Sequence, residues 1–451
     1  MTKTIKIKKG LSLNLKGEAS RDVLPAAGNS KVYALVPDFY AGVLPKPSVK
    51  VGDVVKKGEE VFYDKQYPEI KFVAPIGGTI KAINRGAKRH ILNIEIACDS
   101  DSQEERQFEQ IDVDKSSPEE IKKYLLESGL WGFIMQRPYD IVARPNITPR
   151  DIFVTANFTA PLAPDVPYLL EGRIEHLRLA LKALRKLTPG MVHVSVSKPL
   201  NLNVEGVEEY LVEGPHPAGT NGVLINKTKP VNKGEVVWTL KATDLLVIGR
   251  FLATAKVDFS RQVAIVGSEV KKTGYIKVLP GCPVADLLDG ILLDTERKLR
   301  IIAGDVLVGT KLDESSAYTP LNLDQITVIP EGDDVSELFG WIAPRFNQFS
   351  MNHSYFSWLT PRKEYRLDAR IKGGERAMIM SNEYTKVFPF DIYPEQLIKA
   401  ILAFDIDKME ALGIYEVAPE DFALCEFVDS SKKPLQQIVR QALDLLYKEM
   451  N

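Results

Sequence analysis

Cysteine is scarce in this chain of 451 residues, and its scarcity excludes two kinds of site. The three cysteines, Cys98, Cys282 and Cys425, lie far apart and form no CxxC pair. A disulfide framework or a structural zinc site needs several cysteines at short, regular spacing. The sequence therefore predicts no disulfide framework and no metal site.

Long apolar runs and concentrated charge are also missing. No apolar run approaches the roughly 20 residues that cross a bilayer, and residues 1–8 alternate polar and apolar, which predicts a strand instead of a signal peptide. The net charge is -2, without a long run of lysine or arginine. This argues against nucleic acid as a partner, because phosphate neutralisation needs a concentrated basic surface. We expect a cytoplasmic chain, at most peripheral to a membrane.

Common catalytic motifs are absent as well. The sequence has no GxSxG elbow, no HExxH and no true P-loop. Residues 304–311 have the outline of a P-loop, but Thr310 and Lys311 stand in the wrong order and an apolar run fills positions 306–308. We predict a strand with turns there. His176 and His193 fall within a predicted helix and a predicted strand and are interpreted as structural, so no residue is assigned a catalytic role.

What is present begins with a head of short strands. Composition is that of a globular protein, and the length predicts two to four domains. Residues 51–58 read V-G-D-x-V-x-x-G and residues 74–78 read A-P-x-x-G, which resembles a biotinyl/lipoyl-type barrel-sandwich domain. Lys65 is the nearest candidate for a cofactor-bearing lysine, although its distance from Ala74 does not match the lipoyl spacing. The alternative is an unmodified surface lysine. We place this domain at residues 1–100.

The rest of the chain predicts an α/β domain, a small β module and a helical tail. Ser117, Pro118 and Glu120 form a capping box for a helix that Gly129 ends, and strand and helix patterns then alternate to about residue 255. This alternation favours a Rossmann-like layer of mostly parallel strands over residues 101–255. Short strands return over residues 256–330, and residues 331–451 carry helical periodicities.

Two loops stand out as candidate sites. Residues 129–138 contain two glycines together with Trp131, Phe133, Met135 and Arg137. A phosphate-binding loop needs bare backbone, so this loop predicts binding of something flat and apolar, or packing. Residues 214–222 contain two prolines and three glycines near the expected carboxyl ends of the strands. His216 is a candidate functional group there, and a loop-shaping role for the segment is the alternative.

Several stretches together resemble the A-subunit of the Na⁺-translocating NADH:quinone reductase, over essentially the whole chain. They are residues 9–13, 128–131 with 137–138, 161–163, 216–219, 337–341, 411–413 and 420–428. The resemblance implies a peripheral position on the cytoplasmic face of the bacterial inner membrane. It implies a six-subunit complex that reduces quinone to quinol and exports Na⁺, in which the main partner is membrane-embedded. It also implies a β-grasp-like SLBB module for residues 256–330.

That family is related to the flavoprotein subunit of complex I and to the C-subunit of the Rnf complex. In those relatives a glycine-rich loop holds flavin mononucleotide and a cysteine cluster holds an iron–sulfur centre. Here the corresponding loop is residues 129–138, with few glycines, and the tail keeps only Cys425, where a cluster needs four thiolates. We therefore expect no flavin and no iron–sulfur cluster, and NADH bound elsewhere in the complex.

The resemblance makes quinone the expected ligand. A quinone headgroup needs flat apolar walls and a donor for its carbonyl oxygens. Trp131, Phe133, Met135 and Phe158 are candidate walls, with Arg137 as donor; the alternative is that these residues fill a vacated flavin pocket as core. Two other functions remain open: an independent flavin-dependent NADH oxidoreductase, and a biotin or lipoyl carrier using Lys65.

Overall fold

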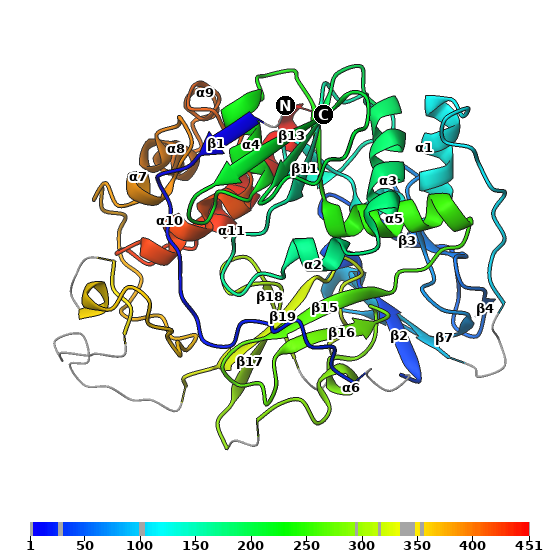
Figure 1. The fold of residues 1–451 in the computed structure, drawn as a ribbon, viewed down its shortest axis with the longest axis horizontal. Helices are drawn as coiled ribbons and strands as arrows, with labels where there is room; N and C mark the ends of the chain where they lie inside the picture. The colour runs from blue at the N-terminus through cyan, green and yellow to red at the C-terminus, as the bar shows by residue number, and fades with distance from the viewer. Residues whose placement is uncertain are drawn as a thin grey trace.

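The computed structural model describes residues 3–25, 30–98, 104–293, 296–313, 317–333, 348–351 and 356–450. Four parts follow one another along the chain: a head of short strands, an α/β layer, a β module and a helical tail (Figure 1). Residues 337–341, one of the stretches that carry the family resemblance, lie outside the described part. None of the helices in that part is long and apolar enough to cross a membrane.

A seven-stranded sheet forms the centre of the α/β layer, in the order β1-β13-β12-β11-β14-β9-β10. The pairs β1–β13, β13–β12, β12–β11 and β11–β14 are parallel, as predicted, while β9 and β10 are antiparallel additions at one edge. The predicted first strand exists, but it joins this sheet and not the head. The strands are β1 (Lys3–Lys6), β9 (Met135–Arg137), β10 (Ile141–Val142), β11 (Ile152–Ala156), β12 (Val192–Val196), β13 (Val207–Glu213) and β14 (Val237–Lys241).

Both faces of this sheet are buried, because successive side chains point to opposite sides. Ile152 and Val154 of β11 belong to the core shared with α3 and α5, whereas Phe153 between them belongs to the core shared with α4 and the tail. Figure 1 shows α3 and α5 on one side of the sheet and α4 with α11 on the other. The helices of this layer are α1 (Pro118–Glu127), η3 (Leu130–Phe133), α2 (Val166–Leu170), α3 (Ile174–Lys186), α4 (Asn221–Thr228) and α5 (Ala242–Thr254).

The signals at the ends of α1 are confirmed. Ser117 accepts a hydrogen bond from the backbone of Glu120, whose side chain accepts one from the backbone of Ser117, and Pro118 occupies the first turn. Gly129 follows with a φ of 74°, the left-handed value that favours glycine. A Cβ there would lie 2.9 Å from Val73 Cγ2, so the loop after α1 packs closely on the head.

The head consists of two small sheets that enclose a common core. Their orders are β2-β8-β7-β4 and β3-β5-β6. Phe62 and Phe72 stack with ring centroids 4.4 Å apart inside it. The elements are β2 (Val32–Leu35), η1 (Pro37–Phe39), β3 (Pro45–Pro47), β4 (Val54–Val55), β5 (Glu60–Asp64), β6 (Lys71–Val73), β7 (Gly78–Arg85), η2 (Ala87–Arg89) and β8 (Ile91–Ala97).

The β module is a five-stranded sheet in the order β16-β15-β19-β17-β18, with α6 as its helix. One prediction here was wrong: residues 306–308 form a turn and not a strand. The Asp305 carboxylate accepts hydrogen bonds from the backbone N–H groups of Leu307 and Val308, which turns the chain despite its β-branched residues. The elements are β15 (Arg261–Val266), β16 (Gly274–Val278), α6 (Val284–Leu288), β17 (Leu299–Ala303), β18 (Thr310–Leu312) and β19 (Gln325–Pro330).

The tail is helical, as predicted, and covers the α4 face of the central sheet. Leu397, Val439 and Leu443 share one core with Phe153 and Val223 of the α/β layer. The tail is therefore folded onto that layer. Its elements are η4 (Phe356–Leu359), α7 (Tyr384–Val387), α8 (Pro394–Leu402), α9 (Ile406–Ala411), η5 (Pro419–Phe422), α10 (Ala423–Val428) and α11 (Leu435–Met450).

Candidate functional site

A cavity of about 410 Å³ lies at the carboxyl edge of the central sheet, and we call it the junction cavity. The carboxyl ends of parallel strands lie at the same edge of a sheet, and α/β sheets usually bind ligands at this edge. All four parts of the chain contribute to its wall. The lining residues used below are Phe39, Phe158, Thr159, His216, Asn221, Lys241, Asp305, Asp324 and Glu420.

Apolar groups form part of this wall. Phe39 comes from η1 of the head, and Phe158 follows β11. Both rings are half-buried, so each presents part of its surface to the cavity. Ala160 and Pro164, also after β11, extend the apolar wall. Such surfaces fit a flat, weakly polar group better than an ion.

Lys241 brings a positive charge to the cavity, and a carboxylate already engages it. Lys241 is the last residue of β14, and its Nζ lies 3.1 Å from Asp324 Oδ2. Arg261 of β15 lies 3.1 Å from the other oxygen of Asp324 and 2.9 Å from Asp244 of α5. Burial alone would raise the pKa of Asp324, but Lys241 and Arg261 outweigh it and lower that pKa. These pairs join the β module to the α/β layer.

The loop of residues 214–222 does reach this edge, as its composition predicted. His216 is buried, its Nδ1 lies 3.2 Å from Thr159 Oγ1, and burial lowers its pKa to about 4. It is therefore neutral near pH 7. Thr220 caps α4, and Asn221 donates from Nδ2 to the carbonyl of Leu240 at 3.0 Å. Asn221 Oδ1 is buried without a hydrogen-bond partner among the described residues.

Glu420 of η5 supplies a carboxyl group from the tail. Its Oε1 lies 3.0 Å from Arg137 Nη2, and Arg137 Nη1 lies 2.8 Å from Asp421 Oδ2. Arg137 Nη1 also donates to the carbonyl of Glu416 at 2.9 Å. The guanidinium and the Asp421 carboxylate are fully buried, while Glu420 is half-buried in the cavity wall.

The predicted contacts do not come together in one place. Only Phe158 among the five lies in the wall of the junction cavity. Trp131 is fully buried, donates from Nε1 to the carbonyl of Ala143 at 2.7 Å and meets Trp238 edge to face, as a core residue does. Phe133 is buried against Phe259.

The remaining two predicted residues also face protein. Met135 of β9 packs against the core that contains α3 and α5. Arg137 is held by Asp421, Glu420 and the carbonyl of Glu416, so its donors point at the tail. Arg137 therefore stands behind Glu420, one layer away from the cavity.

Sequence reasoning missed Lys241, Asn221 and the role of Glu420. Asn221 begins α4 and Lys241 ends β14, and the strand–helix alternation could have located both of these positions. Glu420 gave no local signal, because its partner Arg137 is 283 positions away.

The other residues singled out from the sequence lie elsewhere. Lys65 is exposed in the turn between β5 and β6. Cys425 is buried in α10, and burial raises the pKa of its thiol. His193 of β12 is buried between Phe153 and Tyr210, as a structural histidine is. Within the described residues, no group of three or more His, Cys, Asp or Glu side chains is placed to hold a metal ion.

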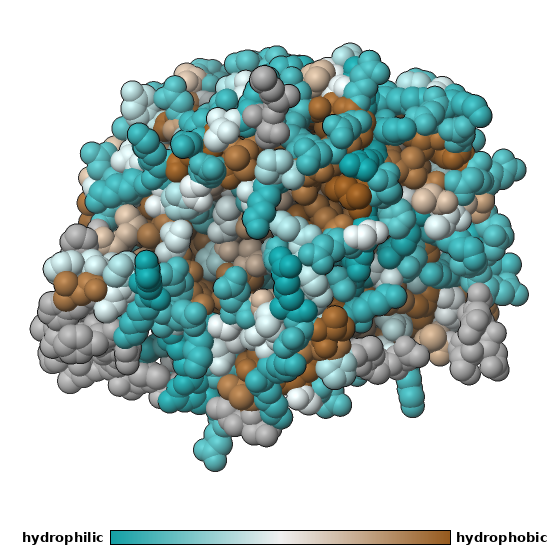
Figure 2. Space-filling view, viewed as in Figure 1, coloured by the Kyte–Doolittle hydropathy of each residue, from teal (hydrophilic) through white to brown (hydrophobic). Residues whose placement is uncertain are grey.

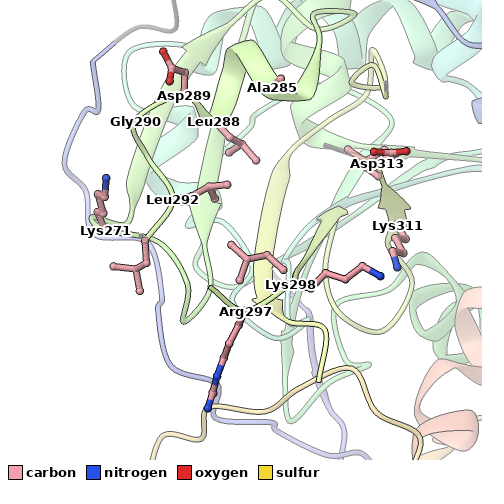
Figure 3. Close-up of a pocket in the computed structure, with 13 residues that line it drawn as sticks. Lys271, Ala285, Leu288, Asp289, Gly290, Leu292, Arg297, Lys298, Lys311 and Asp313 are labelled. Carbon is pink, nitrogen blue, oxygen red and sulfur yellow. The ribbon is translucent and has the colours of Figure 1, made fainter. Parts of the chain in front are cut away.

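A second hollow, of about 1140 Å³, opens on the β module (Figure 3). Leu288 and Leu292 line its floor, with Lys271 on one side and Lys298 and Lys311 on the other. Lys298 pairs with Asp333 and Lys311 with Glu331, so these two cations are already compensated by the protein. Figure 2 shows the face of the molecule in this view as mostly hydrophilic, with apolar residues in small groups.

Three family models match consecutive parts of the chain. The model of the NqrA N-terminal barrel-sandwich hybrid domain matches residues 5–99, and that of the NqrA second alpha/beta domain matches residues 116–257. The model of the NQRA C-terminal domain, an SLBB model, matches residues 262–314. The predicted barrel-sandwich head, α/β layer and SLBB module are thereby confirmed.

Relatives of similar length align with the chain from end to end. Each is named as the A-subunit of the Na(+)-translocating NADH-quinone reductase. The relative from Neisseria meningitidis serogroup B is 35% identical, with 99% of this chain and 100% of that protein covered. The relative from Vibrio campbellii is also 35% identical at the same coverage. The relative from Rhodopirellula baltica is 35% identical, with 98% of both chains covered.

Similarity to a solved structure is much weaker. The NAD+-reducing NiFe hydrogenase in its H2-reduced state aligns over 75% of this chain and 62% of that chain. The identity is 12% and the TM-score is 0.39. Values this low do not establish a common fold.

Proposed function

This chain belongs to the family of the A-subunit of the Na(+)-translocating NADH-quinone reductase, and we propose that it holds the quinone headgroup for that complex in the junction cavity. In this role it takes part in the reduction of quinone to quinol that is coupled to Na⁺ export. It acts by binding and scaffolding, without a flavin or an iron–sulfur cluster of its own. NADH is used by the complex and is not bound by this chain.

The observation that carries the proposal is the composition of the cavity wall. A quinone ring is flat and largely apolar, and the half-buried rings of Phe39 and Phe158 provide surfaces of that kind. The two carbonyl oxygens of the quinone need hydrogen-bond donors, and Lys241 in the cavity wall supplies one.

The site also suits a protein whose parts must stay together. The head, the α/β layer, the β module and the tail all border the junction cavity. A ligand held there bridges the four parts and stabilises their arrangement, because a ligand that binds only the native state favours that state.

We propose that the chain lies on the cytoplasmic face of the bacterial inner membrane as one of six subunits. Its main partner is membrane-embedded.

The direct test is titration of the purified chain with a short-chain quinone by isothermal calorimetry. We expect saturable binding, and we expect Phe158→Ala to weaken it by about tenfold, the loss of one aromatic wall. Phe404→Ala is the matched control, because Phe404 is 72% exposed between α8 and α9 and should leave the affinity unchanged. A folded Phe158→Ala variant with wild-type affinity would remove the junction cavity from the proposal.

A visible spectrum of the same sample tests the alternative function. An independent flavin-dependent NADH oxidoreductase would be purified yellow and would oxidise NADH alone. We expect a colourless protein without that activity. An intact mass equal to that of the unmodified chain would likewise exclude a biotin or lipoyl group on Lys65.

A further inference from the structure

Glu420 differs from the other acidic residues around the junction cavity in how its charge is compensated. Arg137 is its partner at 3.0 Å, but the same guanidinium is bound at 2.8 Å by Asp421. Asp421 Oδ2 also accepts a hydrogen bond from the backbone of Ala418 at 2.8 Å. Asp421 therefore holds Arg137 more firmly than Glu420 does.

Charge counting at this place leaves two carboxyl groups in excess, because Glu420, Asp421 and Asp140 share the single guanidinium of Arg137. Four charged groups surround Glu420. They are Arg137 of β9, Asp421 beside it in η5, Asp140 in the turn between β9 and β10, and Lys241 at the end of β14. Lys241 is already engaged by Asp324 at 3.1 Å. One shared guanidinium cannot neutralise Glu420, Asp421 and Asp140 together. Asp421 accepts from Arg137 and from the backbone of Ala418, whereas among the described residues Glu420 accepts from Arg137 alone, so Glu420 has less to hold it in its charged form. Desolvation raises the pKa of Glu420 to about 7, Asp421 adds to the rise, and Arg137 opposes it.

The other carboxyl groups in the cavity wall are bound differently. Asp324 is compensated by Lys241 and Arg261 and stays ionised. Asp38 lies 2.7 Å from His90 at an exposed position. Asp305 is the nearest rival: burial raises its pKa, but its Oδ1 already accepts hydrogen bonds from the backbone of Leu307 and Val308.

We propose that Glu420 binds the quinone headgroup as a neutral carboxylic acid, donating a hydrogen bond to a carbonyl oxygen, and that its ionisation weakens binding. A quinone carbonyl oxygen can only accept a hydrogen bond. The carboxylic acid has an O–H group that donates one, whereas the carboxylate has only lone pairs, which repel those of the quinone oxygen. The inference rests on the proposed function, since it assigns a pH response to the same cavity.

The experiment measures the dissociation constant of a short-chain quinone for the full chain at pH 6, 7 and 8. We expect wild-type affinity to fall about tenfold from pH 6 to pH 8, the loss of the protonated fraction of one group titrating between them. Glu420→Gln keeps a donor at every pH, so its affinity should change less than about twofold over this range. Asp305→Asn is the matched control and should retain the tenfold change.

Each outcome decides between the two proposals. Absence of quinone binding at every pH overturns the proposed function and this inference together. Binding that does not depend on pH in the wild type, or a tenfold change that persists in Glu420→Gln, overturns the inference alone, as does loss of the change in Asp305→Asn.

A second measurement requires no ligand. In infrared difference spectra, the C=O stretch of a carboxylic acid should vanish from the wild type between pH 6 and pH 8. The same band should be missing from Glu420→Gln, whose folding is checked by its melting temperature. A band that remains in a folded Glu420→Gln variant places the proton on another group and overturns the proposal.

Discussion

Arg144 and Asp64 form a buried ion pair that joins the head to the rest of the molecule, with Nη1 2.9 Å from Oδ2 and both side chains almost fully buried. The same guanidinium donates to the carbonyl of Gly42 at 2.8 Å and to Tyr447 Oη at 3.1 Å. Tyr67 and Tyr447 also lie against its face. Arg144 therefore contacts the head and α11 at once.

Arg144→Ala should destabilise the protein strongly, because it leaves the buried Asp64 carboxylate without its cation. Loss of one partner of a buried ion pair costs about 3–5 kcal/mol. The measurement is the free energy of unfolding in urea. Arg21→Ala is the control: Arg21 pairs with Asp165 at an exposed position, and exposed ion pairs contribute little to stability because water screens them. If Arg144→Ala and Arg21→Ala lowered the free energy of unfolding equally, the pair of Arg144 with Asp64 would not have the stabilising role given to it here.

Trp131→Phe tests whether residues 129–138 bind quinone or form core. The indole is fully buried and its N–H is bonded to Ala143, so the substitution should cost about 1–3 kcal/mol in stability. Quinone affinity of the folded variant should stay within about twofold of wild type, since Trp131 lies outside the lining of the junction cavity. A folded variant without quinone binding would return this loop to the site.

Gly249 marks the close crossing of α3 and α5. A Cβ on Gly249 would lie 1.9 Å from the carbonyl oxygen of His176, a backbone atom that cannot move aside. Gly249→Ala should therefore separate the two helices and lower the free energy of unfolding by about 1–3 kcal/mol. Gly374→Ala is the control, because no atom lies within 4 Å of its added Cβ. Unchanged stability in Gly249→Ala would contradict this packing.

The fold was predictable from the sequence wherever neighbouring residues decide it. Ser117, Glu120 and Gly129 mark the ends of α1, and the strand–helix alternation yields the parallel order of β11 and β12. The turn at residues 306–308 was mistaken for a strand because the Asp305 side chain overrides the apolar pattern.

The site was predictable only in part. The loop with His216 was found because glycine and proline mark it, and Phe158 because it follows a buried strand. The contacts of Glu420 with Arg137 and of Lys241 with Asp324 join residues 283 and 83 positions apart. The spacing of residues along the chain does not indicate which distant side chains pair, so these contacts could be identified only from the folded structure.

His216 provides a pH test of the cavity that is independent of quinone. Burial lowers its pKa to about 4, below the 6.5 of an unfolded histidine. The neutral ring is favoured in the fold, so its contribution is fully present above pH 6.5 and is lost as the pH falls from 6.5 toward 4. Between pH 7 and pH 5 the loss amounts to about 2 kcal/mol.

Urea unfolding at pH 7 and pH 5, compared between wild type and His216→Gln, isolates this contribution. Glutamine remains neutral at both values, so the variant should lose about 2 kcal/mol less than wild type on acidification. Other groups titrate in both proteins and cancel in the difference. His90→Gln is the control, because His90 is an exposed histidine beside Asp38. Equal pH slopes for wild type and His216→Gln would show that His216 becomes charged without cost, and that the wall beside Thr159 is open to water.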